Sequence, residues 1–183
     1  GCFSMYPAKV MTAGEGGFIV TNNKKLRDKL LMIRNHGMLK GYDTRLLGLN
    51  LRLPEINAAI ATIQMKKLPK FLKTRQKNAK LLSKLLSKSN LDLPLERKNE
   101  NVNWYLYTVT TPKRNMLLKK LNAKGIGAAS YYPIPVHKTP FYKSKTKLPI
   151  TDWAASNVLS LPIHPKVTAK NIEFIAKTIS EIF

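Results

Sequence analysis

The residue with the clearest chemical potential is Lys9, which lies in a short loop between two strand-like segments. Ser4 precedes it by five residues, and glycines follow at Gly14, Gly16 and Gly17. A nucleophilic lysine must be partly desolvated and held on a rigid platform, so that its neutral amine can form a Schiff base. A hydroxyl and backbone amides nearby would suit a phosphate group. Because any surface loop can carry lysine and glycine, these residues alone are a weak indication of catalysis.

The remaining reactive residue types form no obvious constellation. None of the ten Asp and Glu residues stands in an acid/base pair, and His36, His137 and His164 lack the spacing of metal ligands. The single cysteine, Cys2, excludes an intrachain disulfide framework and a cysteine-cluster zinc site. We therefore predict no metal centre.

The elements around Lys9 follow from the pattern of apolar and turn residues. Residues 1–6 and 17–21 are predicted to be extended, with a glycine-rich loop between them. A helix is predicted over residues 24–34, because Asn22 and Asn23 are good helix caps and Gly37 is a natural left-handed stop. Residues 38–53 are predicted to be irregular.

A long helical stretch is predicted from Pro54, and its apolar stripe resumes after Pro69. Lysines recur every three or four residues on another side of this stretch, which places them on one helix face. This row is either a solvated surface or a rail for anions. The absence of interleaved aromatic side chains, which would stack on bases, favours the solvated surface. The row comprises Lys66, Lys70, Lys73, Lys77, Lys80, Lys84 and Lys88.

The rest of the chain has the pattern of a compact α/β segment. A strand is predicted over residues 102–110, a helix over 112–124, a short extended piece over 128–132, a short helix from Asp152, a turn over 161–165 and a final helix over 168–183. The aromatic side chains of this segment are predicted to fill its core: Trp104, Tyr105, Tyr107 and Trp153.

Two histidines lie in proline-containing loops of this segment. His137 follows Pro133 and Pro135, which stiffen the loop, and its side chain either contacts substrate or bonds to nearby backbone. His164 lies in the turn before the final helix, where we favour a structural role.

Composition limits the classes of protein. The 183 residues carry a formal net charge of +22, yet 44% are hydrophobic, so a folded core is expected in spite of the charge. No apolar run is long enough to span a bilayer and no secretory signal is seen, so a cytoplasmic location is expected. The 25 Lys against 7 Arg indicate a biased surface composition rather than nucleic-acid recognition, which favours arginine.

Five ordered motifs carry a resemblance to a known family. The chain resembles the pyridoxal-phosphate-dependent nucleotide-sugar aminotransferases of the DegT/DnrJ/StrS family, and the likeness extends over nearly its whole length. The motifs are GCFSMYPAKVMTAGEGGFIVT at residues 1–21, LMIRNHG at 31–37, LGLNLRLPEI at 47–56, YPIPVH at 132–137 and LSLPIHP at 159–165.

The resemblance implies roles for individual residues. The lysine that matches Lys9 bonds covalently to pyridoxal phosphate, and its freed amine then moves a proton between substrate and cofactor. The serine matching Ser4 binds the cofactor phosphate, and the asparagine matching Asn50 reaches across a dimer interface to the partner's phosphate. The loop of His137 lies near the partner's active site, so substrate contact is plausible there. His36 and Arg52 belong to family motifs without an assigned role. A lysine at position 9, where sugar 3-dehydrases carry histidine, points to amino transfer.

The implied fold is the C-terminal portion of a fold-type-I pyridoxal-phosphate transferase, an α/β fold. Residues 1–50 would be the tail of the large cofactor-binding domain, residues 51–89 connecting helices, and residues 90–183 the small C-terminal domain. Family members are much longer, and their first half supplies the aspartate that pairs with the pyridine nitrogen. The chain alone is therefore expected to be inactive and to need a separate N-terminal half.

Three functions remain open at this stage. The first is part of a homodimeric enzyme with shared active sites that aminates a keto-sugar nucleotide, with glutamate as the expected amino donor, in cell-surface polysaccharide biosynthesis. The second is a non-catalytic dimerising remnant of the same fold. The third is a basic nucleic-acid-binding protein, which we regard as the least supported of the three.

Overall fold

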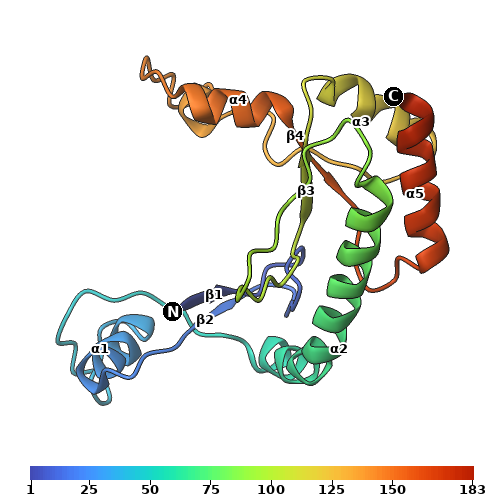
Figure 1. The fold of residues 1–183 in the computed structure, drawn as a ribbon. Coiled ribbons are helices and arrows are strands. Elements are labelled where there is room, and N and C mark those ends of the chain that lie inside the picture. Colours follow the sequence, from blue (N-terminus) through green and yellow to red (C-terminus); the bar gives the residue numbers. More distant parts are fainter. The chain divides into compact units, whose positions relative to one another are not determined.

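The computed structural model describes all residues from 1 to 183, and the chain divides into two compact units, Gly1–Pro69 and Lys70–Phe183. Figure 1 shows the elements of each unit in sequence colours. Each unit is described by itself below.

The first unit begins with a two-stranded antiparallel sheet. Strand β1, Cys2–Ser4, pairs with β2, Gly17–Ile19, and the rings of Phe3 and Phe18 stack across the pair with centroids 4.8 Å apart. Both strands lie within the segments that were predicted to be extended. The loop that joins them carries Lys9, so this hairpin is the platform of the candidate lysine.

Helix α1, Lys24–Arg34, has the predicted bounds. The side chain of Asn23 caps it by accepting a hydrogen bond from the Leu26 amide at 3.1 Å. Left-handed backbone after the helix begins at His36, with a φ of +55°, and continues at Gly37, the predicted stop, with a φ of +72°. A side-chain carbon at Gly37 would collide with the Leu46 carbonyl oxygen, so this glycine also permits close contact between two loop segments.

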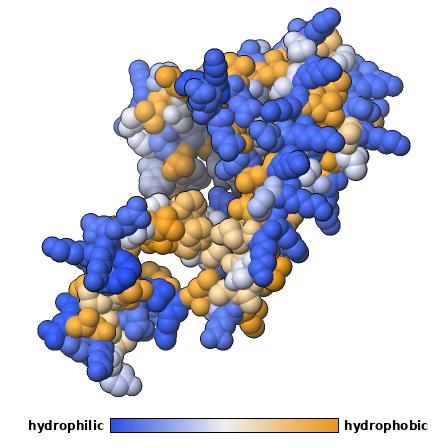
Figure 2. Space-filling view, turned by 60° about the horizontal axis from the view of Figure 1, so that its bottom comes forward, coloured by the Kyte–Doolittle hydropathy of each residue, from blue (hydrophilic) through white to orange (hydrophobic).

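The first unit has little buried core of its own. Only Met5, Met11 and Ala13 are buried in it as a hydrophobic cluster. Many of its large apolar side chains are instead exposed, among them Tyr42 at 98% and Leu47 at 91%. Figure 2 shows hydrophobic surface in orange between the hydrophilic side chains on one face of the molecule.

Helix α2, Glu55–Leu86, is one continuous element that contains Pro69. Proline lacks the amide hydrogen for the helical bond to the carbonyl four residues earlier, but a single missing bond does not interrupt the helix here. The part of α2 after Pro69 buries Ala79, Leu82 and Leu86 in the second unit. The lysines of the predicted row are all exposed.

The second unit is built on an antiparallel strand pair. Strand β3, Tyr107–Thr110, pairs with β4, Val158–Leu161, in the register that places Tyr107 opposite Leu161. Helices α3, Arg114–Ala123, and α5, Ala169–Ile182, pack together, and α3 also contacts β4. The 3-10 turn η1, Val136–Lys138, and helix α4, Pro149–Asn157, lie in the connection between α3 and β4.

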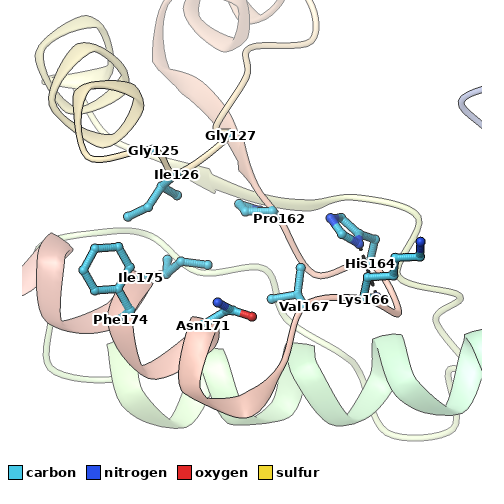
Figure 3. Close-up of a pocket in the computed structure, with 10 residues that line it drawn as sticks. All are labelled: Gly125, Ile126, Gly127, Pro162, His164, Lys166, Val167, Asn171, Phe174 and Ile175. Carbon is cyan, nitrogen blue, oxygen red and sulfur yellow. Dashed lines mark hydrogen bonds between the residues drawn. The ribbon is translucent and has the colours of Figure 1, made fainter.

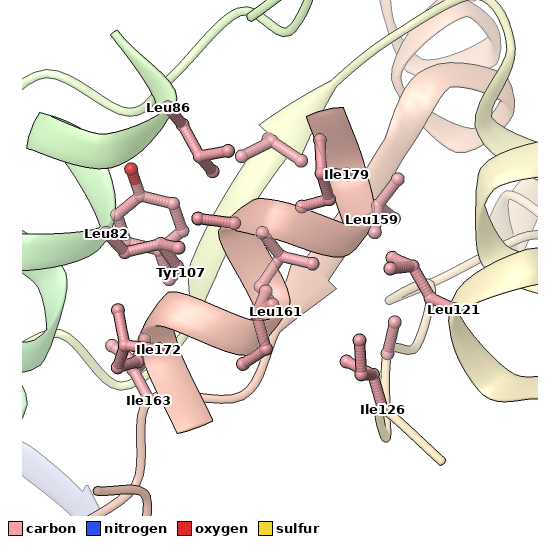
Figure 4. Packing of buried hydrophobic residues seen from close by; sticks show 14 of the residues in the cluster. Leu82, Leu86, Tyr107, Leu121, Ile126, Leu159, Leu161, Ile163, Ile172 and Ile179 are labelled. Atoms are coloured by element: carbon pink, nitrogen blue, oxygen red, sulfur yellow. The ribbon is translucent and has the colours of Figure 1, made fainter. Parts of the chain in front are cut away.

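The core of this unit joins side chains from all of its main elements. The cluster has 19 buried residues, and Figure 4 shows part of it, with side chains from α2, β3, β4 and α5 packed together. Tyr107 is fully buried in this cluster, and its hydroxyl is 2.7 Å from the Ser83 hydroxyl. Burial raises the pKa of Tyr107, and the hydrogen bond with Ser83 opposes that shift only in part.

Several predicted elements of this unit need correction. The predicted strand over residues 102–110 is a strand only from Tyr107, because Trp104 has a φ of +49°, which extended backbone cannot adopt. The stretch before the predicted turn over 161–165 forms β4, for which no strand was predicted. Trp104 and Tyr107 are buried as predicted, but Trp153 on α4 is 54% exposed, so the prediction that it fills the core was wrong.

The final helix confirms its predicted start. Thr168 caps α5 through a capping box, in which the hydroxyl of Thr168 accepts from the Asn171 amide and the Asn171 side chain accepts from the Thr168 amide. Ile172, Ile175 and Ile179 of this helix are buried. No helix of the protein combines the length and the apolar character needed to cross a membrane.

Candidate functional site

Ser4 and Lys9 are linked through the backbone of Tyr6. The Tyr6 amide donates to the Ser4 hydroxyl oxygen at 3.3 Å, and the Tyr6 carbonyl accepts from the Lys9 amide at 3.0 Å. Ser4 is exposed at the end of β1, whereas Lys9 is half-buried. The structure therefore brings these two predicted site residues onto one tight turn.

The loop after Lys9 is tied back to the same strand end. The Met5 amide donates to the Gly16 carbonyl at 2.8 Å, and the Met5 carbonyl accepts from the amide of Ala13 at 3.0 Å and the hydroxyl of Thr12 at 3.1 Å. From α2, the Asn57 side-chain amide donates to the Ala13 carbonyl at 2.6 Å. These bonds brace the loop that carries Lys9, as a nucleophilic lysine would require.

The residues of this turn fit a phosphate-bearing aldehyde such as pyridoxal phosphate. The Ser4 oxygen accepts one hydrogen bond from Tyr6, which leaves its own O–H proton able to bond a phosphate oxygen. Lys9, on the same turn, supplies the amine that condenses with an aldehyde. When bound, that cofactor supplies an electron sink for a carbanion at the carbon that loses or gains the amino group.

Asn50 lies in the irregular segment after α1, and two kinds of contact fix it. Its backbone forms an isolated antiparallel bridge with Asn35, and the amide of the next residue, Leu51, donates to the Arg34 carbonyl at 2.9 Å. Its side-chain oxygen accepts from the Arg52 Nε at 2.8 Å, so the Asn50 amide group is oriented by Arg52. The Asn50 side chain is exposed.

His137 belongs to the second unit, whereas Ser4, Lys9 and Asn50 belong to the first. It lies in η1, and its side chain is only 12% exposed. Its Nε2 atom is 3.6 Å from the Asp152 carboxylate, and Lys138 Nζ lies 2.7 Å from the same oxygen. Asp152 was not singled out from the sequence, because fourteen residues separate it from Lys138 and no motif joins them.

His36 and His164 have local structural contacts. His36 adopts a φ of +55° at the end of α1, and its amide donates to the Leu49 carbonyl at 3.0 Å. The His164 Nδ1 accepts from the Lys166 amide at 3.3 Å, which agrees with the structural role favoured for it. Partial burial, with help from the cations Arg75 and Lys166, lowers the pKa of His164.

His164 also borders a cavity of about 420 Å³ in the second unit. Figure 3 shows it between the turn that follows α3 and the start of α5, with Phe174 and Lys166 at opposite ends. None of the predicted site residues Lys9, Ser4, Asn50 and His137 lines this cavity. Elsewhere, no group of three or more His, Cys, Asp or Glu side chains could hold a metal ion.

The family follows from a comparison with known proteins. The model of the DegT/DnrJ/EryC1/StrS aminotransferase family matches residues 1–180. The chain therefore belongs to this family, and its fold is the part of the family fold that the sequence motifs indicated.

Individual relatives are similar over almost the whole chain. A "Pleiotropic regulatory protein" of Geobacillus stearothermophilus is 33% identical over 99% of this chain and 51% of its own length. The dTDP-3-amino-3,4,6-trideoxy-alpha-D-glucose transaminase of Streptomyces venezuelae is 36% identical over 89% of this chain and 45% of its own. The crystal structure of DesV from S. venezuelae superposes with a TM-score of 0.93 at 32% identity, covering 98% of this chain and 50% of DesV. The chain spans about half the length of the relatives that it matches.

Proposed function

We propose that the chain is the C-terminal part of a pyridoxal-phosphate-dependent aminotransferase that transfers an amino group, with glutamate as donor, to a keto group on a nucleotide-linked sugar. The observation that carries the proposal is the match to an aminotransferase family over residues 1–180, with Lys9 and Ser4 on one braced turn. The transaminase name of the Streptomyces venezuelae relative supports the sugar substrate.

In this proposal each site residue has a defined role. Lys9 anchors the cofactor and, when displaced, moves a proton at the reacting carbon. The Ser4 hydroxyl donates to the cofactor phosphate, while Asn50, oriented by Arg52, reaches the phosphate bound by a second copy of the chain. His137 contacts the substrate. The active assembly is a homodimer with shared sites in the cytoplasm.

The division of labour along the chain is part of the same proposal. Residues 1–50 complete the large cofactor-binding domain, and residues 90–183 form the small domain. Residues 51–89 are the helices that connect the two. The acid that pairs with the pyridine nitrogen would come from the half of the relatives that this chain does not match. We therefore expect the chain to transaminate only when a complementary N-terminal half is supplied.

Reductive labelling tests the role of Lys9. The chain would be mixed with pyridoxal phosphate, with and without the N-terminal half of the Streptomyces venezuelae relative, reduced with borohydride and mapped by peptide mass. We expect labelling of Lys9 to exceed that of Lys24, an exposed lysine on α1 that serves as the internal control. Labelling of Lys9 no higher than that of Lys24, even with the N-terminal half present, would favour the non-catalytic remnant.

Two variants sharpen this experiment. Lys9→Arg keeps the positive charge but cannot form a Schiff base, so the label at this position should be lost. Ser4→Ala removes a hydrogen bond to a charged phosphate, worth about 1.5 to 3 kcal/mol, and should weaken cofactor binding about 10- to 100-fold. A Ser4→Ala chain that binds the cofactor as tightly as the wild type would remove Ser4 from the site.

A further inference from the structure

The loop that carries His137 has little packing to hold it in place. Its large side chains Val136, Phe141 and Tyr142 are 67%, 87% and 61% exposed. Its backbone hydrogen bonds lie within the loop. The Ser144 amide donates to the His137 carbonyl at 2.8 Å, and the Lys143 amide donates to the Thr139 carbonyl at 3.0 Å. These neighbours therefore leave the loop itself weakly packed, although the His137 side chain is only 12% exposed.

Asp152 is the acidic group that meets this loop. It lies in the first turn of α4, where a negative charge is favourable. Its Oδ1 atom is 2.7 Å from Lys138 Nζ and 3.6 Å from His137 Nε2, so two consecutive loop residues converge on one carboxylate oxygen. Together with the short reach of an aspartate side chain, this convergence places η1 against the start of α4.

The Nε2 atom of His137 is buried and lacks a hydrogen-bond partner. This atom is inaccessible to solvent and makes no hydrogen bond, and the carboxylate of Asp152 faces it. A buried donor without an acceptor costs about 1 to 3 kcal/mol, and a closure of well under 1 Å would bring Nε2 and Oδ1 to hydrogen-bond distance. The Lys138 ammonium contacts the same carboxylate oxygen at 2.7 Å and supplies the positive charge that balances it.

We infer that Asp152 is a positioning residue for His137: it accepts the Nε2 proton of the neutral imidazole and so holds the ring with Nδ1 available as an acceptor for a hydroxyl or amide donor of the substrate. The hydrogen-bond partners of the ring nitrogens decide which of them carries the proton. A carboxylate can only accept a hydrogen bond, so the nitrogen that faces Asp152 is the protonated one. The substrate-side role of His137 rests on the proposed function, but the contact with Asp152 does not.

The tautomer can be measured in the whole chain without cofactor or substrate. Nitrogen-15 NMR of the histidine rings, above the pH at which imidazole is protonated, would report which ring nitrogen of His137 carries a proton and whether that proton is protected from water. We expect a protected Nε2 proton and an unprotonated Nδ1 in the wild type. A proton on Nδ1, or an Nε2 proton that exchanges freely with water, would overturn the inference.

Three substitutions separate positioning from mere folding. Asp152→Ser keeps a polar side chain but removes the carboxylate, and it should lower the protection of the Nε2 proton at least tenfold. Asp152→Glu should restore much of it, while Lys138→Met, which removes the competing ion pair, should leave it in place. Protection that persists in Asp152→Ser would refute the role of Asp152.

A fold control accompanies these variants. The amide signal of Ala155, which is buried in α4, shows whether the helix survives the substitution. If Asp152→Ser were to shift that signal, Asp152→Ala would be compared by the same readout, since alanine favours the helix more strongly. None of these NMR measurements needs the cofactor. If the chain were not part of an aminotransferase, the Nε2 proton would still be protected, so that failure can be told apart from failure of the inference about Asp152.

Discussion

The two units of the chain differ in how they are held together. The second unit has a cluster of 19 buried residues, and His137 is the only proposed site residue in it. The first unit carries Lys9, Ser4 and Asn50 but buries only Met5, Met11 and Ala13 as a cluster. It depends instead on backbone hydrogen bonds, a few polar side chains and close glycine contacts. The unit that bears most of the proposed chemistry is therefore the one with the least hydrophobic support of its own.

This contrast has a physical reading. Large exposed apolar surface on a folded chain marks a face that contacts another protein surface. In the first unit that surface includes Tyr42, Leu47 and Ile56, which are 98%, 91% and 76% exposed. The chain spans about half the length of its relatives, and these side chains lie in its first unit.

The largest expected effect comes from a core deletion in the second unit. Leu82→Ala removes a fully buried side chain of α2 and should lower the free energy of unfolding of this unit by about 2 to 5 kcal/mol. Urea titration followed by the amide signals of β3 and β4 would measure it. Met5→Ala, the matched deletion in the first unit, should change that transition by less than about 0.5 kcal/mol. An equal shift from both variants would show that the two units unfold together.

A glycine comparison tests the close packing of the first unit. Gly37→Ala forces a side-chain carbon onto the Leu46 carbonyl at a φ of +72°, and should open the loop before Asn50 at a cost of about 2 to 3 kcal/mol. Gly125→Ala is the control, since Gly125 has a φ of +75° but nothing within 4 Å of an added carbon. It should cost only about 1 kcal/mol. Hydrogen exchange of the Leu49 and Leu51 amides would follow the opening, and unchanged exchange in Gly37→Ala would contradict it.

One buried or partly buried asparagine in each unit allows a second comparison of the two units, with smaller expected effects. Asn78 is 4% exposed and its side-chain amide donates to the Ile163 and Val167 carbonyls at 3.3 and 2.9 Å. Asn78→Ala should therefore destabilise the second unit by about 1 to 3 kcal/mol. Asn57→Ala removes a partly exposed bond to Ala13 and should cost only about 0.5 to 1.5 kcal/mol in the first unit. Thermal melts of both variants measure the difference, and a larger loss from Asn57→Ala would reverse our ranking.

The sequence predicted elements whose signals are local and missed those that depend on distant contacts. The bounds of α1 and the start of α5 followed from Asn23 and Thr168, whose capping is decided within a few residues. Strand β4 was missed because its pairing with β3 joins residues about fifty positions apart. Trp153 was misplaced for a similar reason, since nothing local shows which face of α4 meets the core.

The candidate site divides in the same way. Lys9 and Ser4 could be selected because they lie five residues apart in one motif, and the structure joins them through Tyr6. The Asn57 contact that braces their loop spans 44 residues, and the approach of Asp152 to His137 crosses a loop without a recognisable motif. Residues that support a site from another element were therefore beyond sequence reasoning, although they decide how rigid the site is.

The smallest expected effect is the pH dependence contributed by His164. Its pKa is lowered from 6.5 by partial burial and by Arg75 and Lys166, so the unfolded chain binds a proton at a higher pH than the folded chain does. The stabilisation is complete above about pH 6.5 and is lost as the pH falls through the lower folded pKa. Because His164 is largely exposed, the loss should stay below about 1 kcal/mol. In His164→Asn the side-chain oxygen can still accept from the Lys166 amide, but the titrating ring is lost. The free energy of unfolding of the second unit, measured with urea, should then fall less steeply toward acid pH. His36→Asn in the first unit is the control and should leave that curve unchanged. Superimposable curves for His164→Asn and the wild type would show that His164 ionises equally in the folded and unfolded chain.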